Sequence, residues 1–297
     1  MKIQDTDIIF ISYDEPNCEL NWADLKHKAP WAQRVHGVKG SDNAHKEAAN
    51  MSRTDWFVTI DGDNCVYYDF FDMSIDEQEN INAYSFCGKN CINGLSYGNG
   101  GPKIWNKDFV LNMKTHEAAE DDRAKVDFCW ESGYKNFPAI FSESIINHSP
   151  YQAWRAGFRE GVKMLLLNGV KPKDIKEIYW HNIHRFKVWA SVGSHVKNGN
   201  YAVLGARMGA YFLNCTDWDY VNVRDFDELK KIYDENVNHD KILWSINQYG
   251  KEIKQSTGIH LAYFDEDQSQ YMFEIYDDAI NLGRTYYSKE KPWKSIS

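Results

Sequence analysis

Short apolar runs alternate with polar, helix-forming stretches over the first sixty residues of the chain. The runs are rich in β-branched and aromatic side chains, which is typical of buried strands. They are residues 8–13 and 56–60, and residues 34–36 are predicted as a further short strand between them, closed by Gly37 and Gly40. Residues 20–28 predict one helix between them, and a second is predicted to start at a cap on Asp42 or Asn43 and to continue to about residue 53. Strands separated by such helices predict a mainly parallel sheet.

The pattern changes after Pro150, where apolar residues recur at three- and four-residue steps. This spacing gives one apolar stripe and predicts a helix over residues 151–165. Further helices are predicted at residues 174–189, 200–214, 225–235, 239–254 and 271–282. The sequence therefore predicts an α/β fold: a nucleotide-binding half over residues 1–148, and a mostly helical part over 149–297 packed on it.

The amino-acid composition is that of a folded globular protein without a membrane-spanning segment. Hydrophobic residues make up 43% of the chain and aromatic residues 15%, so a sizeable core is expected and general disorder is excluded. No run of eighteen apolar residues is present, so we expect no membrane span. The first residues lack the features of a signal peptide, and the six cysteines fit no paired zinc motif. A cytoplasmic protein with reduced thiols is the resulting expectation.

Charge is unevenly distributed along the chain. The net charge of −9 argues against a protein that coats nucleic acid non-specifically. Residues 154–187, however, contain eight Lys/Arg and three Asp/Glu, whereas residues 217–278 contain six and fifteen. A basic segment in an acidic chain suggests one face that attracts phosphate groups. A solvated helix surface is the alternative interpretation.

Asp61-Gly62-Asp63 follows directly on the third predicted strand. Ligands of parallel sheets bind at the carboxyl ends of strands, which is where these aspartates fall. Two carboxylates separated by glycine suit Mg²⁺ or Mn²⁺, which prefer oxygen ligands and neutralise the diphosphate leaving group of a sugar nucleotide. An ordinary acidic turn is the alternative.

A glycine-rich stretch, residues 97–102, is predicted to be a loop before a helix from Asn106 to Met113. Gly100 and Gly101 allow close backbone approach to a ligand, so the loop is a candidate lining of a sugar or acceptor pocket. A plain connecting loop explains the composition equally well.

Four residues further along are candidate site residues. Arg155 and Arg159 lie four apart on the predicted helix and would project together, as a phosphate site requires. His148 precedes that helix and is a candidate third metal ligand. Asp127, before a strand-like stretch at residues 128–130, is a candidate general base for an acceptor hydroxyl. Charged helix surface and structural histidine are the competing interpretations.

The order of several sequence segments resembles a group of glycosyltransferases encoded by tailed bacteriophages. The segments are residues 8–17, 34–40, 44–64, 97–113 and 149–164, within a match over residues 7–167 that weakens towards residue 220. These enzymes look like the GT-A glycosyltransferases, whose Asp-x-Asp motif corresponds to Asp61 and Asp63. The resemblance implies a GT-A-like, Rossmann-type mixed sheet flanked by helices, with a helical C-terminal part.

The resemblance also implies a function. It predicts metal-dependent transfer of a sugar, from a donor such as a UDP-sugar, to a hydroxymethylated or already glycosylated cytosine in phage DNA, within the infected cell. Tyr13 is expected to contact the nucleotide base. An inverting reaction needs a base such as Asp127, whereas a retaining reaction needs none. A surface glycan as acceptor, a nucleotidyltransferase, and a non-catalytic nucleotide-binding module stay open as alternatives.

Overall fold

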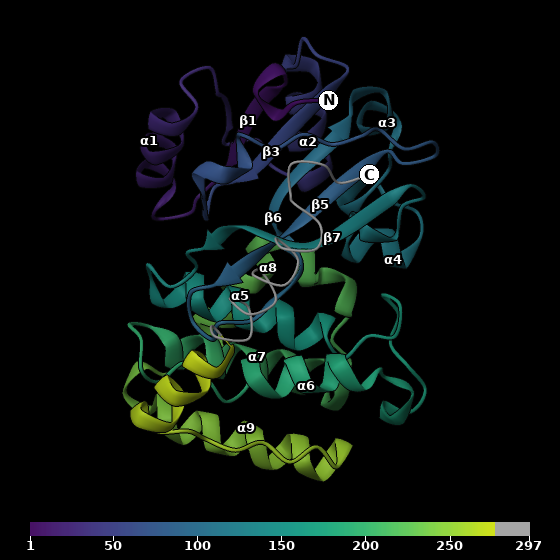
Figure 1. The fold of residues 1–297 in the computed structure, drawn as a ribbon. Coiled ribbons are helices and arrows are strands. Elements are labelled where there is room, and N and C mark those ends of the chain that lie inside the picture. Colours follow the sequence, from purple (N-terminus) through teal and green to yellow (C-terminus); the bar gives the residue numbers. More distant parts are fainter. Residues whose placement is uncertain (277–297) are drawn as a thin grey trace. The chain divides into compact units, whose positions relative to one another are not determined.

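The computed structural model describes residues 1–276, with the backbone alone at residues 98 and 99. These residues form two compact units. The sheet unit comprises Met1–Glu120 and Phe128–Ile145, and the helical unit comprises Asp121–Asp127 and Ile146–Tyr276. Figure 1 shows the strands in the sheet unit and the long helices α5 to α9 in the helical unit. The predicted mixed α/β fold, with a helical C-terminal part, is confirmed.

Within residues 1–276 the strands form one seven-stranded sheet in the order β2-β1-β3-β6-β5-β7-β4. Its parallel part follows the pattern of the sequence and consists of β1 (Asp7–Ser12), α1 (Cys18–Lys28), β2 (Gln33–His36), α2 (Ser41–Met51) and β3 (Trp56–Asp61). β1 pairs in parallel with β2 and β3, and Ile11 lies opposite both Val35 and Asp61. The three predicted strands and two predicted helices are confirmed here.

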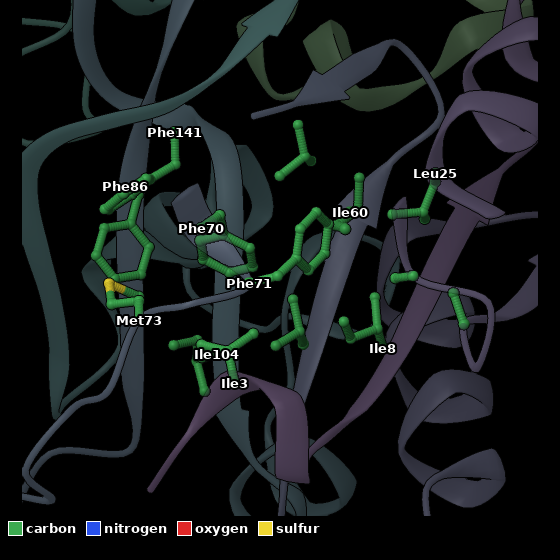
Figure 2. Close-up of a cluster of buried hydrophobic side chains, with 14 of the residues drawn as sticks. Ile3, Ile8, Leu25, Ile60, Phe70, Phe71, Met73, Phe86, Ile104 and Phe141 are labelled. Atoms are coloured by element: carbon green, nitrogen blue, oxygen red, sulfur yellow. The ribbon is translucent and has the colours of Figure 1, made fainter. Parts of the chain in front are cut away.

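The two helices cover opposite faces of this sheet. Strand residues alternate between faces, so Ile8 and Ile9 point to opposite sides. Ile8 belongs to a buried cluster that includes Leu25 of α1, whereas Ile9 belongs to a cluster with Ala48 of α2. Figure 2 shows the first cluster, in which the ring of Phe70 packs with the rings of Phe71, Phe86 and Phe141 and with aliphatic side chains. The burial of both faces explains why β1 and β3 are almost continuously apolar, whereas β2, in which only Val35 is buried, is mostly polar.

The start of α2 differs from the prediction. Neither Asp42 nor Asn43 is the cap, because the helix begins at Ser41 after Gly40, whose φ of +94° favours glycine. A carboxylate from elsewhere in the chain takes the capping role. Glu117 accepts a hydrogen bond from the backbone N–H of Asn43 at 2.9 Å. Such a cap has no local sequence signature, since its donor and acceptor lie far apart in the chain.

The second half of the sheet is formed by three long strands and one short strand, and its pairings are not all parallel. These elements are β4 (Asn64–Val66), β5 (Ala83–Asn90), β6 (Ser96–Asn106) and β7 (Tyr134–Ser144), and the short helix α3 (Lys107–Asn112) follows β6. β6 pairs antiparallel with β3 and β5, and β4 pairs antiparallel with β7. The sheet is therefore mixed, as the family resemblance implies, and the prediction of a mainly parallel sheet is wrong.

Residues 97–102 lie inside β6, so their prediction as a loop is also wrong. A β-carbon on Gly101 would collide with the backbone carbonyl oxygen of Phe86 on β5. Gly100 has φ of +92°, and the β5–β6 register shifts beside it, between Cys87 and Gly88. The glycines therefore allow two irregular strands to stay paired.

The helical unit contains most of the helices within residues 1–276. They are α4 (Asp122–Val126), α5 (Pro150–Lys163), α6 (Trp180–Trp189), α7 (Gly199–Cys215), α8 (Phe226–Asn236) and α9 (Ile242–Thr257), and residues 266–276 are also helical. The helix predicted at 174–189 begins only at Trp180, after a 3₁₀ turn. Of the helix predicted at 271–282, residues 277–282 lie outside the described residues. No helix within residues 1–276 is long and apolar enough to cross a bilayer.

Helices α5 and α7 cross at unusually close range. β-carbons added at Gly157 and Gly161 of α5 would collide with backbone carbonyl oxygens of α7. β-carbons at Gly205 and Gly209 of α7 would collide in the same way with α5. Both helices carry glycine at four-residue spacing, so their backbones approach with no side chain between them. This crossing fixes the position of α5, which carries the two arginines predicted to bind phosphate.

Candidate functional site

The carboxyl ends of β1 and β3 lie side by side at one edge of the sheet. The chain leaves β1 to form β2 on one side and returns to form β3 on the other. Such a reversal in strand order opens a crevice between the loops that follow the two strands, where ligands of α/β sheets bind. Tyr13 follows β1, and Asp61-Gly62-Asp63 lies at the end of β3. The strongest motif of the sequence therefore occupies the reversal point.

Asp61 forms an ion pair with a buried lysine that the sequence analysis missed. Lys103 Nζ donates to Asp61 Oδ2 at 2.8 Å and to the carbonyl oxygen of Gly101 at 3.3 Å. Only 3% of the lysine side chain is exposed, compared with 36% of the aspartate side chain. Lys103 lies opposite Thr59 in the β3–β6 pairing, so it shares a face with Asp61, two residues beyond Thr59.

His45 of α2 lies on the same face of the sheet. Its ring contacts Trp105 and Phe128 at centroid distances of 5.5 and 5.4 Å. Nδ1 lies 2.8 Å from the carbonyl oxygen of Ser41 and must donate to it, which leaves Nε2 as an acceptor. Nε2 is buried and has no hydrogen-bond partner in the described part of the chain. Burial lowers the pKa of His45, an effect that the charge of Asp61 partly opposes, so the ring is neutral near pH 7.

The turn from Asp61 to Asp63 is held from both sides. The Gly62 carbonyl oxygen accepts from Asn21 Nδ2 at 3.0 Å, and the Asp63 carbonyl oxygen accepts from the backbone N–H of Ile145 at 2.7 Å. A β-carbon on Gly62 would lie 2.7 Å from Glu15 Oε2, so a side chain would force the carboxylate of Glu15 to move. The two aspartates are thus presented on a fixed backbone, which favours a binding turn over an incidental acidic one.

A second polar group surrounds the end of β1 on the face covered by α1. Arg34 donates to Glu19 at 2.7 Å and to the hydroxyl of Ser12 at 2.9 Å. The hydrogen bond with Glu19 raises the pKa of Arg34 and lowers the pKa of Glu19. Beside this group, Tyr13 is 39% exposed, while its backbone N–H donates to Glu15. Tyr13 is therefore an accessible aromatic residue at the end of β1.

A divalent cation fits this edge only if the ligand completes its shell. Asp61 and Asp63 supply two carboxylates, and residues 1–276 hold no cluster of three or more His, Cys, Asp or Glu that could bind a metal alone. Mg²⁺ typically uses one or two protein carboxylates together with substrate phosphates and water. Asp63 is the better candidate, because the ammonium group of Lys103 lies 2.8 Å from Asp61 and would repel a cation bound there. Asp63 Oδ1 accepts from Asn64 Nδ2 at 3.0 Å.

Gly100 and Gly101 have a clear structural function in the β5–β6 pairing, described above. The backbone of Gly101 also touches the site, since its carbonyl oxygen accepts from Lys103. The hydroxyl of Ser144 on β7 donates to the carbonyl oxygen of Gly100 at 3.0 Å. A role of the two glycines in an acceptor pocket stays a prediction.

Asp127 belongs to the helical unit, where Lys163 of α5 is its partner. Their side chains are mostly buried, and the Nζ–Oδ2 distance is 2.8 Å. The strand-like stretch predicted after Asp127 is wrong: α4 ends at Val126, and Phe128–Trp130 is a 3₁₀ turn. This ion pair fastens the short segment 121–127 to α5. The role of Asp127 as a general base stays a prediction.

Arg155 and Arg159 project from one side of α5 against the same ring. The guanidinium carbons lie 4.1 and 5.3 Å from the ring centroid of Phe226 on α8. Arg155 is buried, with 7% exposed, and Arg159 is half-buried. His148 is exposed before α5, and its backbone N–H donates to Gln152 Oε1 at 2.9 Å. Phosphate binding by the arginines and metal binding by His148 stay predictions.

Comparisons with known proteins add little to this geometry. No protein-family model matches the sequence, and no curated protein is significantly similar to it. The crystal structure of HddC from Yersinia pseudotuberculosis is similar over 47% of this chain and 72% of HddC, at 15% sequence identity and a TM-score of 0.28. A similarity at that TM-score carries no argument about function.

Proposed function

We propose that the protein is a metal-dependent glycosyltransferase that uses a nucleotide-sugar donor. The observation that carries the proposal is the Asp61-Gly62-Asp63 turn at the carboxyl end of β3, beside the end of β1, where the strand order reverses. The sequence resemblance to phage glycosyltransferases supports the same reaction class. The fixed backbone of the turn and the accessible ring of Tyr13 are features that a donor site requires.

The residues at this edge of the sheet have different proposed roles: cation binding, positioning of a carboxylate, and contact with the nucleotide base. Asp63 would hold Mn²⁺ or Mg²⁺, with Asp61 as a second ligand or as an acceptor for a ribose hydroxyl. The cation would act as a Lewis acid that neutralises the departing diphosphate. Lys103 holds the carboxylate of Asp61 in place at 2.8 Å and keeps a positive charge at this edge. Tyr13 offers its exposed ring to the base of the nucleotide, for which UDP is the first candidate.

The acceptor in this proposal is a hydroxymethylated or already glycosylated cytosine in DNA. Two observations support it: the family resemblance, and the excess of Lys and Arg over residues 154–187 in a chain of net charge −9. Enzymes that modify a base act on single strands or flip the base out of the duplex. If transfer inverts the anomeric configuration, a general base such as Asp127 is needed to deprotonate the acceptor hydroxyl. If transfer retains the configuration, no such base is needed.

A panel of sugar nucleotides tests the proposal directly. The protein is incubated with each donor and Mn²⁺, with hydroxymethylcytosine DNA, unmodified DNA or a glycan mixture as acceptor. We expect nucleoside diphosphate release that requires the cation and increases with hydroxymethylcytosine DNA. Release with glycans alone would favour a surface-glycan enzyme. Pyrophosphate release would favour a nucleotidyltransferase, and binding of donor without any release would favour a non-catalytic module.

A further inference from the structure

The start of α6 exposes two adjacent aromatic side chains to solvent. Trp180, the first residue of the helix, is 80% exposed, and Tyr179 before it is 47% exposed. His181 stacks on Tyr179 with a centroid distance of 5.4 Å and an interplanar angle of 7°. Trp180 meets the same histidine edge-on at 5.9 Å and 85°. Aromatic side chains therefore form a continuous, largely exposed surface here.

This aromatic surface is held by the chain around it. Ile178 is buried immediately before it, and the hydroxyl of Tyr179 donates to Asn168 Oδ1 at 3.5 Å. On the next turn of α6, His184 Nε2 lies 2.7 Å from the hydroxyl of Tyr276. A ring on a fixed backbone loses little conformational entropy when a ligand stacks on it.

The segment that carries these aromatic residues is predominantly positive in charge. Residues 171–187 contain five Lys/Arg and two Asp/Glu, and the exposed lysines are Lys171, Lys173, Lys176 and Lys187. Of the two acids, Asp174 already caps a turn by accepting from the backbone N–H of Lys176 at 2.9 Å. Flexible cations around rigid aromatic rings are the combination with which proteins bind single-stranded nucleic acid.

We propose that residues 171–187 bind a single-stranded stretch of DNA, with a base stacked on Trp180 and phosphates contacted by the surrounding lysines. A single strand is favoured over a duplex because a base must expose its face to stack on the tryptophan, whereas duplex bases cover each other's faces. The inference deepens the proposed function, since it assigns a surface to the DNA acceptor. Binding itself requires neither a sugar donor nor a metal ion.

The chain supplies a matched control for the tryptophan. Trp244 near the start of α9 is 61% exposed, but it lies in the acidic part of the chain. An exposed tryptophan in a segment of net negative charge should not bind DNA. A control also exists for the lysines, since Lys231, Lys241 and Lys251 are exposed in that same acidic part.

The test measures anisotropy of a labelled oligothymidylate titrated with the full chain at several salt concentrations. Trp180→Ala should weaken binding about tenfold with an unchanged salt slope, because stacking releases no counterions. Joint replacement of Lys171, Lys173 and Lys176 by Gln should reduce the log–log salt slope by about 2. Trp180→Phe should keep most of the affinity. Trp244→Ala and the triple Gln variant of the control lysines should bind as the unmodified chain does.

Several results would overturn the inference. These are no binding of oligothymidylate by the unmodified chain, equal binding by Trp180→Ala, and binding to anionic lipid vesicles that the oligonucleotide does not compete. The outcome is separable from that of the proposed function. Oligonucleotide binding that depends on Trp180, without any sugar transfer, would reject the glycosyltransferase proposal and support DNA binding by residues 171–187. Sugar transfer to DNA that is insensitive to Trp180→Ala would support the glycosyltransferase proposal and reject DNA binding by these residues.

Discussion

Lys103 on β6 and Asp61 at the end of β3 form an ion pair whose two partners differ in their access to solvent. The ammonium group is nearly inaccessible, whereas more than a third of the aspartate side chain is exposed. Water can therefore solvate the carboxylate if the lysine is removed, but it cannot solvate the ammonium if the aspartate is removed. The fold should therefore tolerate the loss of Lys103 much better than the loss of Asp61.

Asp61→Ala is expected to lower the free energy of unfolding by about 3 kcal/mol, because it leaves a buried ammonium group without its counter-charge. Lys103→Met keeps the buried methylene chain and should cost about 1 kcal/mol or less. The double variant should regain most of the stability lost in Asp61→Ala. Urea unfolding of the three variants measures this, and equal losses in both single variants would contradict the asymmetry.

The same three variants separate folding from function. If Asp61 serves the donor site, transfer activity stays low in the double variant although its stability returns. Activity that recovers together with stability would show that Asp61 acts only by holding the fold of this edge.

Asp63→Asn is expected to reduce cation-dependent product formation by about 100-fold or more, since it removes a negative charge from the proposed metal site. The turn should keep its shape, because its backbone is held by Asn21 and Ile145. Asp76→Asn, at an exposed position of the same unit, is the control for loss of one carboxylate. Near-normal turnover of Asp63→Asn in EDTA-treated buffer with added Mn²⁺ would remove the metal role.

His45 should make the fold sensitive to acid. Burial lowers its pKa in the folded chain, so below about pH 6.5 the unfolded chain binds a proton that the folded chain does not. The free energy of unfolding should then fall by up to about 1.4 kcal/mol per pH unit as the pH decreases further. Urea unfolding of His45→Leu from about pH 5 to 8 should show a weaker dependence on pH.

The control for His45 is His27→Gln, at an exposed position of α1. It removes one histidine without changing the core and should keep the pH dependence of the unmodified chain. A His45→Leu variant that loses stability in acid as steeply as the unmodified chain would assign the effect to other groups.

The parallel part of the fold could be predicted because its signals are local. β1 and β3 are short apolar runs, β2 is a short stretch closed by Gly37, and the polar stretches between the strands have helical composition, so each element is recognisable without its partners. The position of Asp61 at a strand end follows from that order alone. The cap on α2 could not be predicted, since Glu117 comes from a segment more than seventy residues away.

The second half of the sheet was missed because its signals are not local. Gly101 in β6 is required by the carbonyl oxygen of Phe86 on β5, and Gly100 by its φ of +92°, yet in the sequence these glycines have the composition of a loop. Lys103 was missed for the same reason. A lysine after a predicted loop indicates an exposed charge, and only the β3–β6 pairing places it beside Asp61. Its position two residues before Trp105, on the same face as that buried ring, was the available signal.

Phosphate binding by Arg155 and Arg159 can be separated experimentally from their packing against Phe226. Arg159 is half-buried, so Arg159→Gln should raise the donor KM about tenfold with little change in stability. Arg155 is buried and lies 4.1 Å from the ring centroid of Phe226, so Arg155→Gln should also lower the free energy of unfolding by about 1–2 kcal/mol.

Phe226→Leu supplies the comparison, because it removes the ring and leaves both guanidinium groups. If the arginines bind a phosphate group, this variant loses stability while its donor KM changes much less than in Arg159→Gln. Steady-state kinetics with varied donor, alongside urea unfolding, measures both quantities. A donor KM that rises equally in Phe226→Leu and Arg159→Gln would mean that the arginines act by supporting the α5–α8 contact, and the assignment of a phosphate site to α5 would then be withdrawn.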